Sequence, residues 1–492
     1  MHLTPSAESK GSWQPRRIQE SRSSSIFSGT LVMASIIWVT AVGVAHADEV
    51  DDYITAQMDR QHIPGLSLAV VKDGQPVKVL GYGVADMELD VRATPETVYQ
   101  IGSISKQFIA AGVLRLVEEN KVGLDDSIRK YIEDAPETWQ VITLRHLLTH
   151  TSGLVRETPD LQLKAQSVID AIRSSYSKPL AFAPGEKWQY SNLGYFALAE
   201  VINRAAQKPW PQYLQEKIFA PLGMNATRTT TVEELVPHRA GGYHWMDSNR
   251  YQNAQVVSGV RPSGAFLSSV VDLAKWDAAL CSDNVFSPEQ RALMWTPVKL
   301  NDGSEKPYGF GWEIGKAGGH RQVKHAGTMI GFRAQLVRFP DDRLTIVVLT
   351  NATQALPEKI AQGVAAFYLP DLKSAHNKRN ATQLSAEALD SYIGQYRFSG
   401  SRVVTVARHE DKLTVSMAMA LPGLSPEVAS LLQGVNMQIA LLAPETTTRF
   451  FDQEDPRSTY IFSTNAEGRV QLVIEDHAGK AGQPAEKLSL QK

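Results

Sequence analysis

Ser103 and Lys106 are the first pair of residues whose types and spacing suggest chemistry. A serine hydroxyl is a weak nucleophile until a neighbouring group takes its proton. Residues three apart on a helix lie on one face, with Cβ atoms about 5–6 Å apart, so the lysine amine can reach the hydroxyl. A helix N-terminus also places unpaired N–H groups beside a developing oxyanion. Ser-x-x-Lys is nevertheless common by chance, and serine often caps helices, so the pair alone is a weak indicator of catalysis.

A second candidate segment, Tyr190-Ser191-Asn192, follows the turn-forming dipeptide Pro184-Gly185. A tyrosine phenol held beside a lysine can relay a proton. The amide of Asn192 can hold a substrate carbonyl. The alternative is that Ser191 or Asn192 only caps the helix expected from Leu193.

The third segment is His325-Ala326-Gly327-Thr328, just ahead of strand-like residues. Glycine lets a backbone approach a ligand closely. The backbone N–H of Thr328, at a sheet edge, could complete an oxyanion hole. His325 could contact a substrate carboxylate or the leaving group, although a lone histidine more often has a structural role.

The periodicity of apolar residues predicts the elements that must position these segments. Asp73-Gly74 between two β-rich runs is a strong hairpin signal. Gly123 ends a helix that begins at Ser103. The strands expected in this part are 66–71, 77–82, 332–339 and 344–349. The helices expected are 103–121, 168–176, 193–206 and 357–369, and residues 125–300 are mostly helical or loop-like. The pattern predicts an α+β fold, with one antiparallel sheet packed against helices and an inserted helical region.

Short, evenly spaced strand-like runs fill the C-terminal part of the chain, which predicts a small all-β sandwich or barrel. These runs are 392–398, 402–408, 413–417, 437–442, 446–451, 460–464 and 470–475. A polar stretch precedes them. We therefore predict four parts: a signal peptide (1–47), a main domain (48–370), a linker (371–384) and an all-β domain (385–492).

The N-terminus has the features of an export signal. Three arginines precede an apolar run over 26–45, and Ala45-His46-Ala47 has the small-x-small form of a cleavage site. We expect cleavage after Ala47 and a periplasmic or secreted protein with no stable membrane span. The alternative is an uncleaved anchor, because about 20 apolar residues would span a bilayer.

Composition excludes several classes of protein. The chain has 492 residues, with 50 Lys+Arg against 52 Asp+Glu, a net charge of −2. Nucleic-acid-binding proteins usually carry a basic surplus, so no nucleic acid partner is expected. Cys281 is the only cysteine, which rules out an intrachain disulfide, and we expect it to be a buried small hydrophobe. His146 and His150 have the spacing of a metal pair but no matched third ligand. No metal or cofactor is expected.

Taken together, the three segments resemble the serine penicillin-recognising family. That family comprises class C β-lactamases, D-alanyl-D-alanine carboxypeptidases, D-aminopeptidases and β-lactamase-like esterases. The resemblance covers about 54–369 and includes five further stretches. These are 97–102, Leu144–Leu154 (with His146 and His150), Pro262-Ser263-Gly264, Asp272-Leu273-Ala274 and Tyr308-Gly309-Phe310-Gly311-Trp312. The all-β region resembles the lipocalin-like domain appended to some members, starting at Tyr392-Ile393-Gly394-Gln395-Tyr396.

The resemblance implies a β-lactamase/transpeptidase-like fold and a role for each residue of the three segments. Ser103 resembles the acylated serine, Lys106 its proton-accepting partner and Tyr190 the tyrosine that passes the proton to the leaving group. Asn192 resembles the asparagine that orients the substrate. The backbone N–H groups of Ser103 and Thr328 would donate to the oxyanion. Which of Lys106 and Tyr190 is the primary base stays open.

One departure from the family pattern bears on the substrate. Many β-lactamases have Lys-Thr-Gly where this chain has His325-Ala326-Gly327, and histidine is only partly charged near neutral pH. Lys324 is a doubtful substitute because neighbouring strand residues point to opposite faces. We therefore expect a serine hydrolase that acts on an ester, amide or D-amino-acid peptide and is weak on β-lactams.

Two further questions stay open from the sequence. The alternative to an enzyme is a penicillin-binding or regulatory protein that acylates with little turnover. The C-terminal domain is either a spacer or a part that shapes the substrate cleft through the stretch 421–434. Trp245, Tyr251 and Trp312 could line that cleft, although aromatic residues are more often core. The substrate and the oligomeric state are not determined.

Overall fold

The computed structural model describes residues 44–156, 167–229, 234–246, 249–254, 261–264, 266–282, 285–374, 379–398, 402–418, 429–430, 432–453, 455–456, 458–475 and 480–488. The predicted signal peptide lies outside these residues, except for its last four, which open helix α1 (Val44–Gln61). In the described ranges, no helix is both long enough and apolar enough to cross a membrane.

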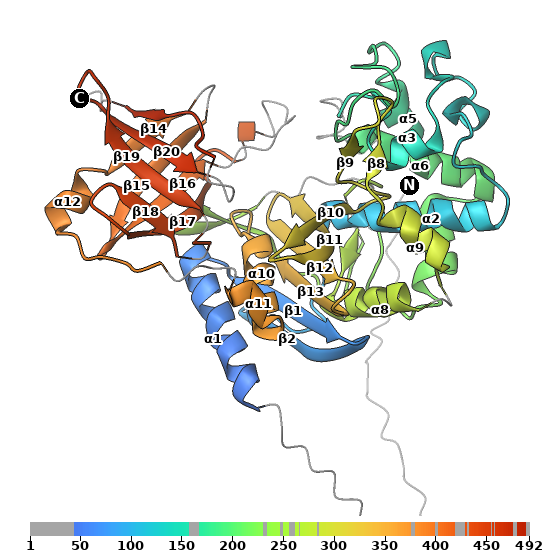
Figure 1. The fold of residues 1–492 in the computed structure, drawn as a ribbon. Helices are drawn as coiled ribbons and strands as arrows, with labels where there is room; N and C mark the ends of the chain where they lie inside the picture. The colour runs from blue at the N-terminus through green and yellow to red at the C-terminus, as the bar shows by residue number, and fades with distance from the viewer. Residues whose placement is uncertain are drawn as a thin grey trace, which may run out of the picture. The chain divides into compact units, whose positions relative to one another are not determined.

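A seven-stranded antiparallel sheet forms the centre of the larger domain (Figure 1). In spatial order its strands are β10 (Glu313–Ala317), β11 (His320–Met329), β12 (Phe332–Phe339), β13 (Leu344–Thr350), β1 (Gly65–Lys72), β2 (Gln75–Asp86) and β3 (Val91–Arg92). The predicted hairpin is β1–β2. Its turn residues, Asp73 and Gly74, have φ of 53° and 75°, the positive values that a tight hairpin turn of this kind requires.

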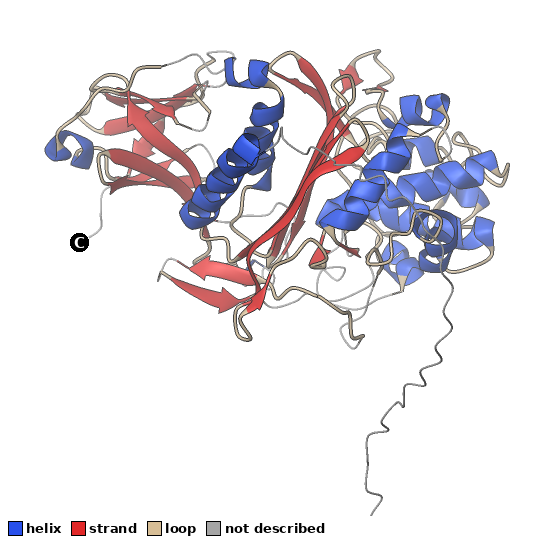
Figure 2. Ribbon diagram, turned by 90° about the horizontal axis from the view of Figure 1, so that it is seen from below, coloured by secondary structure: helices blue, strands red, loops and turns tan. Residues whose placement is uncertain are grey.

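Helices cover both faces of this sheet, because strand side chains alternate between the two faces (Figure 2). Leu66, Leu68 and Val70 of β1 pack on one side with α1 and α10 (Pro357–Tyr368). Ala69 and Val71 belong to the larger core on the other side, which contains the helical region. Helix α1 was not expected from the sequence.

The helical region surrounds α2 (Ser105–Glu118), which is buried along most of its length. The other elements are α3 (Leu144–Leu148), α5 (Val168–Arg173), α6 (Asn192–Ala206), α7 (Trp210–Leu214), the π-helical turn η4 (Gln215–Phe219), α8 (Val270–Cys281) and α9 (Pro288–Met294). The predicted helix starting at Ser103 is in two parts. A 3₁₀ turn, η1 (Gly102–Ile104), leads into α2.

The C-terminal region is a closed antiparallel barrel. Its strands are β14 (Gly394–Arg397), β15 (Val403–His409), β16 (Lys412–Ala418), β17 (Asn436–Pro444), β18 (Arg449–Asp452), β19 (Thr459–Thr464), β20 (Val470–Glu475) and β21 (Ala485–Lys487). Each of the seven predicted runs overlaps one of these strands. The short β21, which pairs with both β14 and β20 and so closes the barrel, was missed. The predicted α+β fold with a C-terminal β-barrel is therefore confirmed.

Side-chain contacts join the barrel to the sheet domain within one compact unit, residues 45–492. Lys359 of α10 donates to the carboxylate of Asp452 at 2.8 Å and to the carbonyl of Ile439 at 2.6 Å. Burial raises the pKa of Asp452, and the Lys359 charge opposes that rise. Arg333 of β12 donates to the thioether of Met437 at 3.2 Å. The stretch 421–434, considered above as a part that could shape the cleft, lies mostly outside the described residues.

The structure corrects one expectation about a side chain, that of Cys281, and decides between the two alternatives considered for Trp312, which belongs to the core. Cys281 is exposed because it is the last residue of α8, and its sulfur accepts a hydrogen bond from Arg338 at 2.9 Å. Trp312 does not line a cleft, because it is fully buried beside Trp295, with ring centroids 6.2 Å apart.

Candidate active site

Ser103 lies in the η1 turn immediately before α2 and is partly exposed, whereas its neighbours Ile104, Ser105 and Lys106 are buried. The turn and the helix together place the buried Lys106 next to Ser103, and Lys106 Nζ lies 3.1 Å from Ser103 Oγ. The predicted serine–lysine pair is thus in hydrogen-bonding contact. A partly exposed hydroxyl above a fully buried amine is accessible to a substrate while its partner is shielded from water.

The amine of Lys106 also donates hydrogen bonds to acceptors from other segments. Nζ donates to Asn192 Oδ1 at 2.9 Å and to the carbonyl of Ser263 at 2.7 Å. Both of these oxygens can only accept. A neutral amine would therefore keep its lone pair for Ser103, whereas an ammonium would donate its third proton to Ser103. The geometry accommodates both states of Lys106.

Tyr190 reaches Ser103 from a loop that is distant in sequence. Its phenol donates to Ser103 Oγ at 2.8 Å, and Lys106 Nζ lies 4.7 Å from the centre of its ring. Arg156 lies 5.0 Å from the same ring centre. Two basic side chains therefore lie beside the ring of Tyr190.

The residues after Tyr190 begin helix α6. The hydroxyl of Ser191 accepts from Gly194 N at 3.2 Å, so Ser191 is the N-cap that was considered. Asn192 is the first residue of the helix, and its side chain bonds Lys106. Ser191 therefore caps the helix, whereas Asn192 belongs to the polar cluster around Ser103.

Two glycines bring strand β11 against the turn that carries Ser103. A Cβ on Gly102, where φ is 53°, would lie 2.3 Å from Thr328 N, and a Cβ on Gly327 would lie 1.9 Å from Ile101 O. Only glycine allows this approach. The N–H of Thr328 thus lies beside the backbone of the Ser103 turn, where an oxyanion hole requires it.

His325 lies close to the site but is buried and neutral. Burial, and secondarily the positive charge of Lys106, lower the pKa of His325 to about 3. Its Nε2 lies 3.0 Å from the hydroxyl of Tyr308, and its Nδ1 lies 2.7 Å from the carbonyl of Ala326. His325 therefore carries no charge with which to attract a carboxylate at neutral pH. Lys324 points to the other face of the sheet and pairs with Glu358 of α10.

Several residues at this site had no predicted role. Ser263 and Tyr308 lie in stretches that already carried the family resemblance, so a signal for them existed. His150 was considered only for metal binding. Its Nδ1 accepts from Ser191 N at 3.1 Å, as that of His146 accepts from Thr143 N at 3.2 Å. The partner of His150 comes from a tertiary contact, and that of His146 belongs to the N-cap of α3. The spacing of the two histidines alone does not predict either contact.

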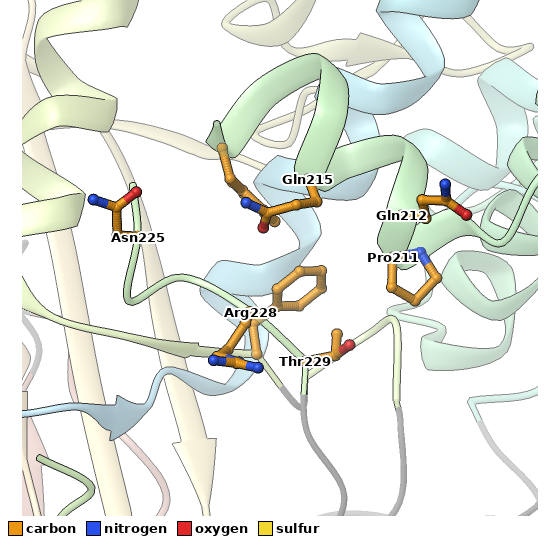
Figure 3. A pocket seen from close by; sticks show the side chains of 8 residues that line it. Pro211, Gln212, Gln215, Asn225, Arg228 and Thr229 are labelled. Atoms are coloured by element: carbon orange, nitrogen blue, oxygen red, sulfur yellow. The ribbon is translucent and has the colours of Figure 1, made fainter. Parts of the chain in front are cut away.

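A separate pocket of about 350 Å³ lies beside α7 and the π-helical turn (Figure 3). It is lined by Pro211, Gln212, Gln215, Phe219, Asn225, Arg228, Thr229 and Phe266. None of the seven predicted site residues lines it. Among the described residues that line it, no nucleophile lies beside a base.

The family follows from a comparison of the sequence with known proteins. The beta-lactamase family matches residues 50–368, more than half of the chain, and the chain belongs to this family. It is 28% identical to penicillin-binding protein 4* of Bacillus subtilis (strain 168) over 371 residues, 68% of this chain and 80% of the relative. It is 26% identical to protein flp of Staphylococcus aureus (strain MW2) over 363 residues, 71% of this chain and 70% of the relative. The resemblance predicted from the sequence is confirmed.

Solved structures show the same fold. An octameric penicillin-binding protein homologue from Pyrococcus abyssi matches with a TM-score of 0.64 at 24% identity, over 90% of this chain and 100% of that chain. D-amino acid amidase from Ochrobactrum anthropi SV3, complexed with L-phenylalanine amide, matches with a TM-score of 0.56 at 23% identity. That match covers 68% of this chain and 99% of the amidase. Family and neighbours together support a serine hydrolase of the β-lactamase fold.

Proposed function

We propose that the chain is an exported serine hydrolase that works through an acyl-enzyme on Ser103. It cleaves an ester, an amide or a D-amino-acid peptide and is weak on β-lactams. One observation carries the proposal: Lys106 Nζ and the Tyr190 phenol converge on Ser103 Oγ, at 3.1 and 2.8 Å. A serine hydroxyl between an amine and a phenol has two groups within reach that can take its proton.

In the acylation step, Ser103 Oγ forms a bond to the substrate carbonyl carbon and its proton passes to the Lys106–Tyr190 pair. The carbonyl oxygen becomes an oxyanion and accepts from the N–H groups of Ser103 and Thr328. The tetrahedral intermediate then breaks its bond to the leaving alcohol or amine, which takes the proton through Tyr190. Asn192, which is held by Lys106, orients the substrate carbonyl.

Deacylation repeats these steps with a water molecule as the nucleophile in place of Ser103. A water molecule gives a proton to the same pair as its oxygen bonds to the acyl carbon. The bond to Ser103 Oγ then breaks, and that oxygen recovers the proton. The free acid leaves, and the site returns to its starting state.

The neutral state of His325 supports the proposed preference against β-lactams. A β-lactam carries a carboxylate, and the position that holds lysine in many β-lactamases offers no positive charge here. The amidase neighbour, by its name, makes D-amino-acid amides a natural first substrate to try.

The test is a substrate panel with the purified mature protein. We expect turnover of a short-chain nitrophenyl ester or a D-amino-acid amide, and slower turnover of nitrocefin. The Ser103→Ala variant should lose at least about 10³-fold in kcat. Hydrolysis that survives Ser103→Ala would refute the nucleophile. A burst of product without steady turnover would favour the alternative, a penicillin-binding protein that acylates and stalls.

A further inference from the structure

We propose that His150 is the positioning residue for Tyr190 and fixes the direction of its phenol towards Ser103. This inference rests on the proposed function, in which Tyr190 passes the proton. His150 is the residue after Thr149 at the end of α3, forty residues before Tyr190 in sequence. Among the described residues, His150 makes no hydrogen bond to Ser103, and it would act through Tyr190.

His150 holds the backbone on both sides of Tyr190. Its carbonyl accepts from the N–H of Gln189 at 2.9 Å, and its Nδ1 accepts from the N–H of Ser191 at 3.1 Å. One residue therefore fixes the peptide groups before and after the tyrosine. Rotation of this short segment would carry the phenol away from Ser103 Oγ, to which it now donates at 2.8 Å.

The imidazole ring also supports the tyrosine ring directly. The two ring centroids are 4.3 Å apart, and the rings are tilted by 39°. The His150 side chain is 1% exposed, and its ring also lies 4.7 Å from that of Tyr308 and 5.3 Å from that of Tyr195. A ring packed on several sides cannot move aside to let Tyr190 shift.

The backbone of His150 adopts a conformation that few residue types accept. Its φ is 62°, in the left-handed region, where Asn, Asp and His are found more often than other side-chain-bearing residues. Asparagine tolerates this conformation and carries a side-chain oxygen close to where Nδ1 lies, which makes it the conservative replacement.

The contact also specifies the protonation state. A backbone N–H can only donate, so Nδ1 must be unprotonated and the ring proton must reside on Nε2. Burial lowers the pKa of His150 well below its ordinary value, and the nearby Lys106 and Arg156 add to this. A neutral Nε2–H ring is therefore the state that holds Ser191.

The experiment compares two variants that separate the ring from the acceptor. His150→Phe keeps a buried ring but cannot accept from Ser191, whereas His150→Asn keeps an acceptor without the ring. We expect His150→Phe to lower kcat about 10- to 100-fold with little change in KM, since a displacement of about 1 Å can cost that much. His150→Asn should recover to within about 3-fold of the wild type, because the hydrogen bond to Ser191 restores the segment.

Two controls show whether the effect passes through Tyr190. His146 lies four residues before His150, and its Nδ1 likewise accepts from a backbone N–H, that of Thr143, at 3.2 Å. His146→Phe removes this acceptor and should leave kcat unchanged. In a Tyr190→Phe background, His150→Phe should cause no further loss. A full kcat for His150→Phe, an equal loss in His146→Phe, or an undiminished additional loss in the Tyr190→Phe background would overturn the proposal.

A measurement on the wild type covers the case in which His150→Phe does not fold. Nitrogen NMR of ¹⁵N-histidine-labelled protein distinguishes the two neutral tautomers. The proposal requires His150 as Nε2–H from pH 6 to 8, and an Nδ1–H or charged ring would overturn it. The result also separates this inference from the proposed function, because Ser103→Ala activity tests the nucleophile while the tautomer tests only the His150 contact.

Discussion

The Ser103 site and the barrel interior are built on opposite principles. The site gathers hydroxyl, amine, phenol and amide groups from segments far apart in the chain around the buried Lys106. The barrel interior is apolar and comes from simple alternation: in β15 and β16, Val404, Val406, Leu413 and Val415 point inwards and their neighbours are more exposed. Burying a charged or polar group costs free energy unless the group is paired, whereas burying a methyl group stabilises the fold.

The comparison teaches where function and stability are located in this molecule. Substitutions at the site should change rates strongly and stability weakly. Substitutions in the barrel interior should do the reverse.

The largest expected effect is on the rate, at Tyr190. Tyr190→Phe should lower kcat on the best ester or amide by about 10²- to 10⁴-fold, because the phenol no longer passes a proton. Its melting temperature should stay close to that of the wild type, since the ring remains.

Tyr195 provides the matched control for Tyr190. It is also beside Lys106, but its buried hydroxyl donates to the carbonyl of Leu148 at 2.9 Å. Tyr195→Phe should cost about 1 kcal/mol of stability and leave kcat unchanged. Equal losses of kcat in the two variants would contradict the role given to Tyr190.

The next effect is on stability, in the barrel. Phe462 is buried and packs against Phe450, Tyr392 and Tyr396. Phe462→Ala should lower the free energy of unfolding by about 3–5 kcal/mol, measured by denaturant titration. For the folded fraction, kcat on a small ester should stay within about 2-fold of wild type. A loss of kcat comparable to that of Tyr190→Phe would show that the two regions are not separable.

The third prediction concerns pH and His325. In the folded protein the pKa of His325 is about 3, below the ordinary value of 6.5. Between these two pH values the unfolded chain therefore binds a proton that the folded protein does not bind. The stability that results is complete above pH 6.5 and is lost as pH falls towards 3, at roughly 1.4 kcal/mol per pH unit. His325→Gln should make the fall in stability between pH 6 and pH 4 shallower by about one proton. An unchanged slope would show that His325 is charged in the folded protein.

The same residue also bears on the pH profile of activity. Because His325 stays neutral above about pH 3, the acid limb of kcat/KM between pH 5 and 8 should be the same in His325→Gln as in the wild type. Disappearance of that limb in the variant would assign it to His325.

Much of the fold could be predicted from the sequence, because the relevant signals are local. The hairpin at Asp73-Gly74, the strands of the barrel and α6 all follow from turn residues and apolar periodicity. Helix α1 was missed because its sequence is polar overall. The buried apolar residues among its described side chains are Val50, Ile54 and Met58, spaced four apart. The short β21 was missed because three residues are too few to show a pattern.

At the site, the sequence by itself determined the residue types and the spacing of Ser103 and Lys106, because a helical turn brings residues three apart together. The family resemblance singled out Tyr190, Asn192, Gly327 and Thr328, and the folded chain brings these four to the same place. Only the tertiary structure decided that His325 is neutral, that Ser263 holds Lys106 and that His150 holds the backbone around Tyr190. These depend on burial and on contacts between distant segments, and the free energy of a charge is set by its surroundings, which no local pattern records.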